Sequence, residues 1–127
     1  MRLTSNFKKS EFECKCGCEM PAEVLLNIKN LATQLQFIRD FIKLPIAMTN
    51  AYRCSSHNKA VGGVVNSQHV VGKAADLQVK SLSPNELYNT INTLAAYDHV
   101  SQGGLGLYNT FVHYDIRGTK ARWQKNK

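Results

Sequence analysis

Two segments that are far apart in the chain carry histidine and aspartate at spacings that constrain the fold more than any other feature. Ser67–Asp76 contains His69 and Asp76, and Val112–Asp115 contains His113. A zinc ion accepts two neutral imidazole nitrogens and one carboxylate oxygen, and a catalytic site leaves its fourth position to water. We therefore expect the fold to bring these three side chains together around one Zn²⁺ ion per chain.

Two predicted strands can carry the aspartate and the second histidine on the same face of a sheet. Alternation puts Asp76 on one face of Ala74–Val79, and it puts His113 and Asp115 on one face of Phe111–Asp115. If the two strands are neighbours, Asp76 and His113 converge. A carboxylate among small strand residues also calls for a nearby cation, because burying an unpaired charge is costly. The alternative is a pair of hydrogen-bonded histidines, with Asp76 solvated at a strand end.

The remaining pattern predicts an α+β domain. Apolar residues from Leu25 to Ile42 recur at three- and four-residue steps, which indicates an amphipathic helix of about twenty residues. Ser83-Pro84-Asn85-Glu86 has the cap, proline and glutamate of another helix start. We also expect strands over 46–51, 74–79, 103–108 and 111–115, the last two joined as a hairpin, and a short helix over 55–61. The result is a small antiparallel sheet packed with helices, in one domain over 1–127 whose residues 1–20 form an irregular arm.

The cysteines stand at Cys14, Cys16, Cys18 and Cys54. The first three alternate, so their side chains would share one face of an extended segment. Structural zinc sites more often use Cys-x-x-Cys pairs, which this chain lacks. Reduced and partly buried thiols, a disulfide from this group to Cys54, and a second metal site all stay open.

Basic residues outnumber acidic ones by 16 to 9, which gives a formal net charge of +7. Such a surface favours polyanionic partners: an anionic cell wall, a nucleic acid or a membrane surface. No nucleic-acid-binding motif is present, and no apolar run approaches the roughly 20 residues of a membrane span. A solvated basic tail is the simpler interpretation of the cations at the C-terminal end, which are Arg117, Lys120, Arg122, Lys125 and Lys127.

The histidine and aspartate segments resemble a known family. Ser67-Gln68-His69-x-x-Gly72-x-Ala74-x-Asp76 with a later His-x-Asp is similar to the motif of the zinc D-alanyl-D-alanine metallopeptidases. This group includes VanY-type carboxypeptidases and phage endolysins that cut L-alanyl-D-glutamate bonds, and its fold is shared with the hedgehog signalling domain. Asn50-Ala51-Tyr52-Arg53-Cys54 and Gly103-Gly104-Leu105-Gly106 extend the resemblance over about residues 47–123.

The resemblance implies a role for each matching residue. His69, Asp76 and His113 would be the zinc ligands. Arg53 would bind the substrate carboxylate or the developing oxyanion, whereas without such a role it would form a surface salt bridge. Ser67 would line the substrate cleft, whereas its simpler role is a loop-capping hydroxyl.

The chain departs from this family at one catalytic position. Many members carry a glutamate general base three residues before the last zinc histidine, and Thr110 stands there. Asp115 is the nearest carboxylate on the metal-facing side of that strand. It could accept the proton of metal-bound water, or it could orient His113 or pair with Arg117.

These patterns and the resemblance together predict a zinc peptidase that acts on peptidoglycan stem peptides, as an endolysin-type endopeptidase of a phage or prophage. A D-alanyl-D-alanine carboxypeptidase is the alternative within enzymes. A non-catalytic, zinc-containing virion or wall-binding protein is the alternative of another class, because the family's glutamate is missing. The N-terminus lacks the apolar segment of a secretory signal. We therefore expect synthesis in the cytoplasm and action on the wall after release, or association with a virion.

Overall fold

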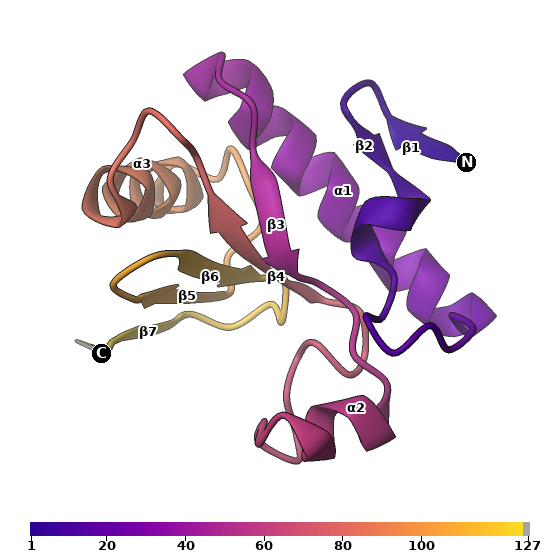
Figure 1. Cartoon of the computed structure of the whole chain (residues 1–127). Helices are drawn as coiled ribbons and strands as arrows, with labels where there is room; N and C mark the ends of the chain where they lie inside the picture. The colour runs from indigo at the N-terminus through magenta and orange to yellow at the C-terminus, as the bar shows by residue number, and fades with distance from the viewer. Residues whose placement is uncertain (126–127) are drawn as a thin grey trace.

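The computed structural model describes residues 1–125, so Lys127 of the basic C-terminal group lies outside the described residues. Figure 1 shows a twisted sheet with helices beside it. The helices are α1 (Ala22–Ile42), α2 (Ser55–Ala60) and α3 (Pro84–Ala96), with a 3₁₀ turn η1 (Lys9–Phe12). The strands are β1 (Arg2–Thr4), β2 (Phe7–Lys8), β3 (Ala47–Asn50), β4 (Ala74–Gln78), β5 (Gly104–Leu107), β6 (Val112–Asp115) and β7 (Ala121–Gln124).

The main sheet has five strands in the order β3-β4-β6-β5-β7. Its first three pairs are antiparallel, and β5 and β6 form the expected hairpin. The last pair, β5 with β7, is parallel. The α+β class predicted from the sequence is therefore confirmed, with one parallel edge strand added to the antiparallel sheet.

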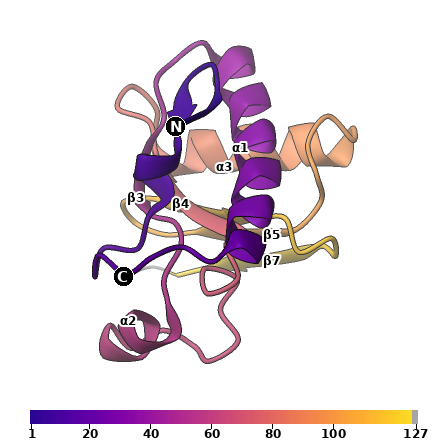
Figure 2. The same ribbon diagram turned by 90° about the vertical axis from the view of Figure 1, so that its right-hand side faces the viewer.

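One face of the sheet belongs to the hydrophobic core. Leu77 and Tyr114 point from β4 and β6 into this core, where they join Ile28 and Leu35 of α1 and Ile91 of α3. Helix α3 lies against β5 and β6, and the turned view in Figure 2 shows α1 running along the molecule in front of the sheet. Because side chains alternate along a strand, the residues between these core positions point to the opposite face, which carries Asp76 and His113.

Helix α3 begins as the sequence predicts. The side chain of Ser83 accepts a hydrogen bond from the backbone N–H of Glu86, and the Glu86 side chain accepts one from the backbone N–H of Ser83. This reciprocal capping satisfies amide donors that the first helical turn otherwise leaves unpaired. Pro84 occupies the first turn, where a missing N–H costs nothing.

The first part of the N-terminal arm is not irregular, contrary to the prediction for residues 1–20, whereas residues 13–20 contain no helix or strand. Strands β1 and β2 pair as an antiparallel hairpin, and η1 follows directly. Phe7 and Phe12 are both buried, with ring centroids 6.1 Å apart, and both belong to the main core. Strands of two or three residues carry too little periodicity to be predicted from sequence, so this order comes from the packing of the two rings.

The C-terminal end is not a solvated tail over Ala121–Gln124, because this segment forms β7 at the edge of the sheet. Arg122 is held by Asn92, by Gln102 and by the backbone oxygen of Gly103. A guanidinium that makes these bonds is part of the fold and not a free surface charge. Within residues 1–125, no helix is long and apolar enough to cross a membrane.

Candidate metal centre and cleft

His69 lies in the loop that follows α2 and enters β4. Its Nδ1 donates to the backbone oxygen of Ala51 at 2.7 Å, so its Nε2 carries the free lone pair. Gly72 reverses the loop with a φ of +77°, and a Cβ there would meet a side-chain carbon of Val24 at 2.8 Å. Only glycine fits both the left-handed backbone and the close approach to α1. His69 is 3% exposed.

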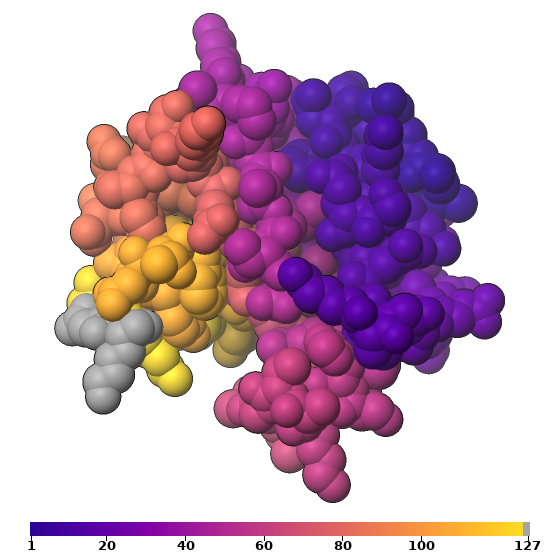
Figure 3. Space-filling model, in the orientation of Figure 1, coloured from indigo at the N-terminus to yellow at the C-terminus, as the bar shows by residue number. Residues whose placement is uncertain are grey.

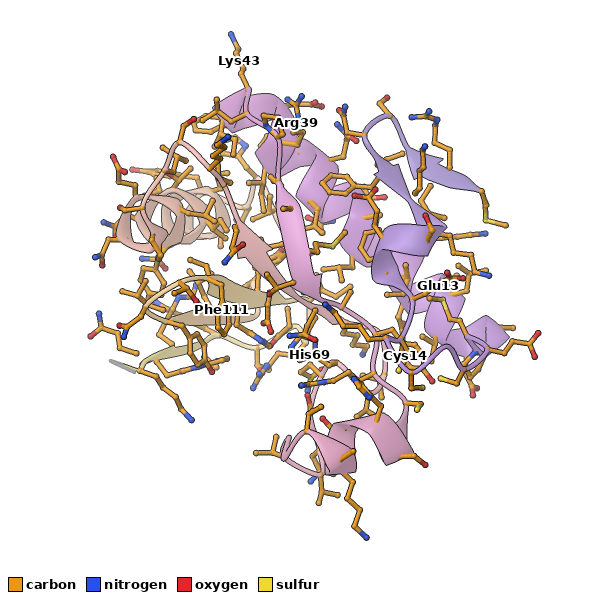
Figure 4. All side chains as sticks on the ribbon, viewed as in Figure 1. Glu13, Cys14, Arg39, Lys43, His69 and Phe111 are labelled. Atoms are coloured by element: carbon orange, nitrogen blue, oxygen red, sulfur yellow. The ribbon has the colours of Figure 1, made fainter. Side chains whose placement is uncertain are left out.

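Asp76 and His113 are direct neighbours across strands β4 and β6. Asp76 Oδ1 lies 3.3 Å from His113 Nδ1 and 3.3 Å from His69 Nε2. The two imidazole rings meet edge to face, with centroids 5.2 Å apart. Figure 4 shows His69 between the sheet and α2. The structure thus brings together the three residues that the sequence singles out as candidate ligands.

The donor atoms of this cluster suit a metal ion. One ligand atom from each of the three residues lies within 4.8 Å of the others. Asp76 Oδ1 is buried and has no hydrogen-bond partner, which is costly for a carboxylate oxygen unless a cation meets it. His113 donates through Nε2 to Asp115, so its Nδ1, like Nε2 of His69, offers a lone pair. Two neutral imidazoles and one carboxylate form a donor set that fits Zn²⁺.

Electrostatics keep Asp76 ionised in this buried position. Burial by itself would raise the pKa of Asp76, but the imidazoles of His113 and His69, when they carry a proton towards it, outweigh that effect and hold the pKa well below its usual range. Burial would likewise lower the pKa of His113, but the carboxylates of Asp115 and Asp76 raise it above the ordinary value. The cluster therefore favours a cation among its three side chains.

Asp115 is fully buried, and its carboxylate is occupied by donors. Oδ2 accepts from His113 Nε2 at 2.7 Å, and Arg117 donates to both oxygens at 2.7 and 2.9 Å. The backbone N–H of Gly104 donates to Oδ1 at 2.8 Å. Burial would raise the pKa of Asp115, yet these donors hold it well below its usual range. Asp115 is not among the residues that line the cleft, and this geometry matches the orienting alternative better than the general base.

Two glycines of β5 create the space around this network. A Cβ at Gly104 would lie 2.2 Å from Asp115 Oδ2, and a Cβ at Gly106 would lie 2.3 Å from Trp123 Nε1. Trp123 stands against His113, with ring centroids 5.1 Å apart. The glycine-rich segment of the sequence therefore lets a carboxylate and an indole approach β5 from β6 and β7.

The cluster lies in a cleft of about 550 Å³. The wall opposite the sheet is the segment after α2, which projects from the body of the molecule in Figure 3. Arg53 and Ser67 both line this cleft, as the resemblance implies. Ser67 Oγ accepts from the backbone N–H of His69 at 3.2 Å and from Arg53 Nη2 at 3.5 Å. Its hydroxyl thus shapes the loop and also faces the cleft.

Arg53 carries a donor without a partner. Its Nε is buried and makes no hydrogen bond, and among residues 1–125 no carboxylate lies within ion-pair distance of its guanidinium. The surface salt bridge considered for Arg53 is therefore absent from the described part of the chain. A guanidinium that lines the same cleft as the candidate metal ligands and has no carboxylate partner can bind an anionic or polarised oxygen.

Sequence reasoning missed several side chains of the cleft. Asn50 donates to Asp76 Oδ2 at 3.5 Å, and Tyr108 stacks on Phe111 with centroids 4.3 Å apart. Trp123 Nε1 donates to the hydroxyl of Tyr108 at 3.0 Å. Asn50 opens the segment Asn50–Cys54, which the resemblance already covers, so it could have been found. Trp123 could not, because its place depends on the unexpected strand β7.

A buried pair of histidines and an aspartate at the base of a cleft, with a guanidinium in the same cleft, is an arrangement that metal-dependent hydrolases use. Residues 4–115 match the family model described as Peptidase M15, and the chain belongs to this family. The family resemblance noted in the sequence is thereby confirmed. At the level of the family, this makes the chain a metallopeptidase of the kind that acts on peptidoglycan. A search of curated proteins finds no match to the chain.

Proposed function

We propose that the chain is a zinc peptidase that cleaves peptide bonds in peptidoglycan stem peptides, as an endolysin-type endopeptidase of a phage or prophage. The observation that supports this most is the buried His69–Asp76–His113 cluster, which opens into a cleft that also holds the unpaired Arg53. It acts on the cell wall after release from the cytoplasm, or as part of a virion.

Each residue of the cluster has a task in this proposal. His69, Asp76 and His113 hold Zn²⁺, which when bound lowers the pKa of a water ligand toward about 7 and polarises the scissile carbonyl. Arg53 donates to the substrate carboxylate or to the oxyanion that develops at the carbonyl. The backbone oxygen of Ala51 fixes the tautomer of His69. Ser67 holds the loop and the guanidinium in place.

A digest of purified peptidoglycan, with and without chelator, tests the reaction. An endopeptidase releases muropeptides with new amino termini inside the stem peptide, whereas a carboxypeptidase releases free D-alanine. Mass spectrometry of the soluble products separates these outcomes. If zinc-loaded protein released neither kind of product, the non-catalytic wall-binding alternative would take precedence.

Substitution of Asp115 by asparagine is expected to weaken zinc binding by roughly 10- to 100-fold, the usual cost of losing a group that orients a metal ligand. His113 and Arg117 both donate hydrogen bonds to the Asp115 side chain. The amide nitrogen of asparagine is itself a donor, so it could not accept these bonds and His113 would lose its orientation. Activity should return in excess zinc. Zinc affinity and hydrolysis rate are measured on the same protein.

Asp98→Asn is the matched control for this variant. Asp98 is exposed and has a φ of +60°, a conformation that asparagine tolerates, so both readouts should stay at the wild-type level. Unchanged zinc affinity with a collapsed rate in Asp115→Asn would instead make Asp115 the general base, for which losses of about 10²- to 10⁴-fold are typical.

Hydrolysis of intact peptidoglycan is expected to slow as salt rises. The net charge of +7 draws the protein to an anionic wall, and salt at physiological strength limits that attraction to about 8 Å. A small, soluble stem peptide serves as the control substrate, since its cleavage does not depend on attachment to a charged polymer. Equal salt dependence for both substrates would mean that the basic surface does not contribute to wall binding.

A further inference from the structure

A second group of metal-binding side chains lies outside the cleft. The cysteine cluster consists of Cys14, Cys16, Cys18 and Cys54, which come from the η1–α1 connection and from the end of the segment after β3. Its four sulfur atoms all lie within 4.8 Å of one another, and all four cysteines are free. Figure 4 shows Cys14 between the N-terminal part and α2, to one side of the sheet.

Three of the sulfur atoms are spaced close to the edges of a tetrahedron around a metal ion, and the fourth, of Cys18, lies within 4.8 Å of them. The Sγ atoms of Cys14 and Cys16 are 3.2 Å apart, those of Cys16 and Cys54 are 3.4 Å apart, and those of Cys14 and Cys54 are 3.8 Å apart. Four sulfurs at the usual Zn–S distance of about 2.3 Å are separated by about 3.8 Å along each edge. A disulfide requires about 2.05 Å and joins sulfurs only in pairs.

Local backbone geometry explains how three alternating cysteines reach one point. Residues two apart in an extended strand are separated by about 6.6 Å, which is too far for sulfurs in contact. The backbone N–H of Gly17 donates to the oxygen of Cys14 at 3.0 Å, and Gly17 has a φ of +84°. This tight turn folds Cys16 and Cys18 back toward Cys14, and it replaces the usual Cys-x-x-Cys turn.

We propose that the cysteine cluster binds a structural Zn²⁺ ion through four thiolates, in addition to the zinc of the cleft. The backbone N–H of Cys54 also points at Cys14 Sγ at a distance of 3.4 Å. Such a donor stabilises the charge of a coordinated sulfur. Four sulfur ligands leave no position for water, so this ion has a structural and not a catalytic role.

This zinc would anchor the segment that serves the cleft. Tyr52 N–H donates to the backbone oxygen of Phe12 at 3.0 Å, and Arg53 N–H donates to the backbone oxygen of His69 at 3.1 Å. The backbone oxygen of Ala51, the residue before Tyr52, accepts a hydrogen bond from the His69 ring. Residues 51–54 therefore lie between the two metal sites. A zinc ion bound by four thiolates would fix these residues to the N-terminal arm and so maintain the relative positions of Arg53 and His69.

The test uses the double variant H69A/H113A, which removes both imidazole ligands of the cleft. We expect this protein, purified with reductant and zinc, to retain one equivalent of zinc, and its X-ray absorption spectrum to report four sulfurs at about 2.3 Å. Adding Cys16→Ser, at an exposed position of the cluster, should abolish this zinc. Adding Lys15→Ala, at the exposed neighbouring position, should leave it bound.

Three results would overturn the proposal: a double variant without zinc, a spectrum dominated by nitrogen and oxygen ligands, or fewer than four titratable thiols in the unfolded protein purified without reductant. The last result would assign the cluster to disulfides. None of these readouts depends on hydrolysis, so failure here leaves the proposed peptidase function to be judged on its own digest.

Discussion

Replacing either His69 or His113 by alanine is expected to remove the zinc of the cleft and reduce hydrolysis of peptidoglycan to background. Each variant leaves one imidazole and Asp76, and two protein ligands are fewer than the three that catalytic zinc sites use. Metal content after gel filtration and turnover of purified wall are the two measurements. Zinc bound to the cysteine cluster should persist, so total zinc should fall by one equivalent and not to zero.

The other two histidines provide matched controls for these variants. His57 and His99 lie outside the cluster of ligands, and His99 is exposed and stacks on Phe37 with centroids 5.6 Å apart. His57→Ala and His99→Ala should keep full zinc content and full activity. If His69→Ala and His113→Ala both kept full zinc occupancy, the assignment of the metal ligands would be wrong.

The central pair of the site could be predicted from sequence because it depends on strand geometry. Alternation alone places Asp76 and His113 on single faces of their strands, and the β4–β6 register then makes them neighbours. The loop residue His69 needed more information. A histidine in a loop has no fixed direction, and its place follows from the left-handed Gly72 and from the backbone oxygen of Ala51.

The role of Asp115 could not be predicted, because its surroundings come from other strands. Alternation places Asp115 beside His113 but does not tell whether it faces water or protein. The answer depends on Gly104 of β5, which leaves room for the carboxylate, and on Arg117, which pairs with it. Both are tertiary effects. They place a residue that sequence offers as a base where it accepts a hydrogen bond from Nε2 of His113, a candidate metal ligand.

The edge strand β7 was missed for a related reason. Its sequence, Ala121-Arg122-Trp123-Gln124, is half polar and follows a basic stretch, so it has no clear strand period. It joins the sheet through parallel pairing with β5 and through the hydrogen bonds of Arg122 to Asn92 and Gly103. The formation of this strand therefore depends on residues that are distant in sequence. With it comes Trp123, which forms part of the cleft wall.

Replacing Arg53 by alanine is expected to lower kcat/KM by about 10²- to 10³-fold, which is typical for loss of a donor to a developing oxyanion. Arg53 lines the cleft, and no carboxylate within residues 1–125 pairs with its guanidinium, so it can bond to substrate without first breaking an ion pair. Zinc content should not change, because Arg53 contributes no ligand atom. Arg53→Lys should recover only part of the rate, since an ammonium lacks the planar fork.

Arg39→Ala is the matched control for Arg53→Ala. Arg39 is also partly exposed, and Figure 4 places it near the far end of α1, away from His69. Its loss should leave turnover unchanged. If Arg53→Ala were as active as the control, Arg53 would have no contact with the reacting substrate, and the resemblance would fail at this residue.

The kinetic form of the Arg53→Ala defect also separates the two roles proposed for the guanidinium. A donor to the oxyanion acts only in the transition state, so its loss lowers kcat with little change in KM. A donor to a substrate carboxylate acts in both the bound substrate and the transition state, so its loss raises KM and leaves kcat close to wild type. Steady-state rates on a soluble stem peptide distinguish these patterns. A rise in KM that disappears when the substrate lacks its terminal carboxylate would assign Arg53 to carboxylate binding, which is the contact a carboxypeptidase requires.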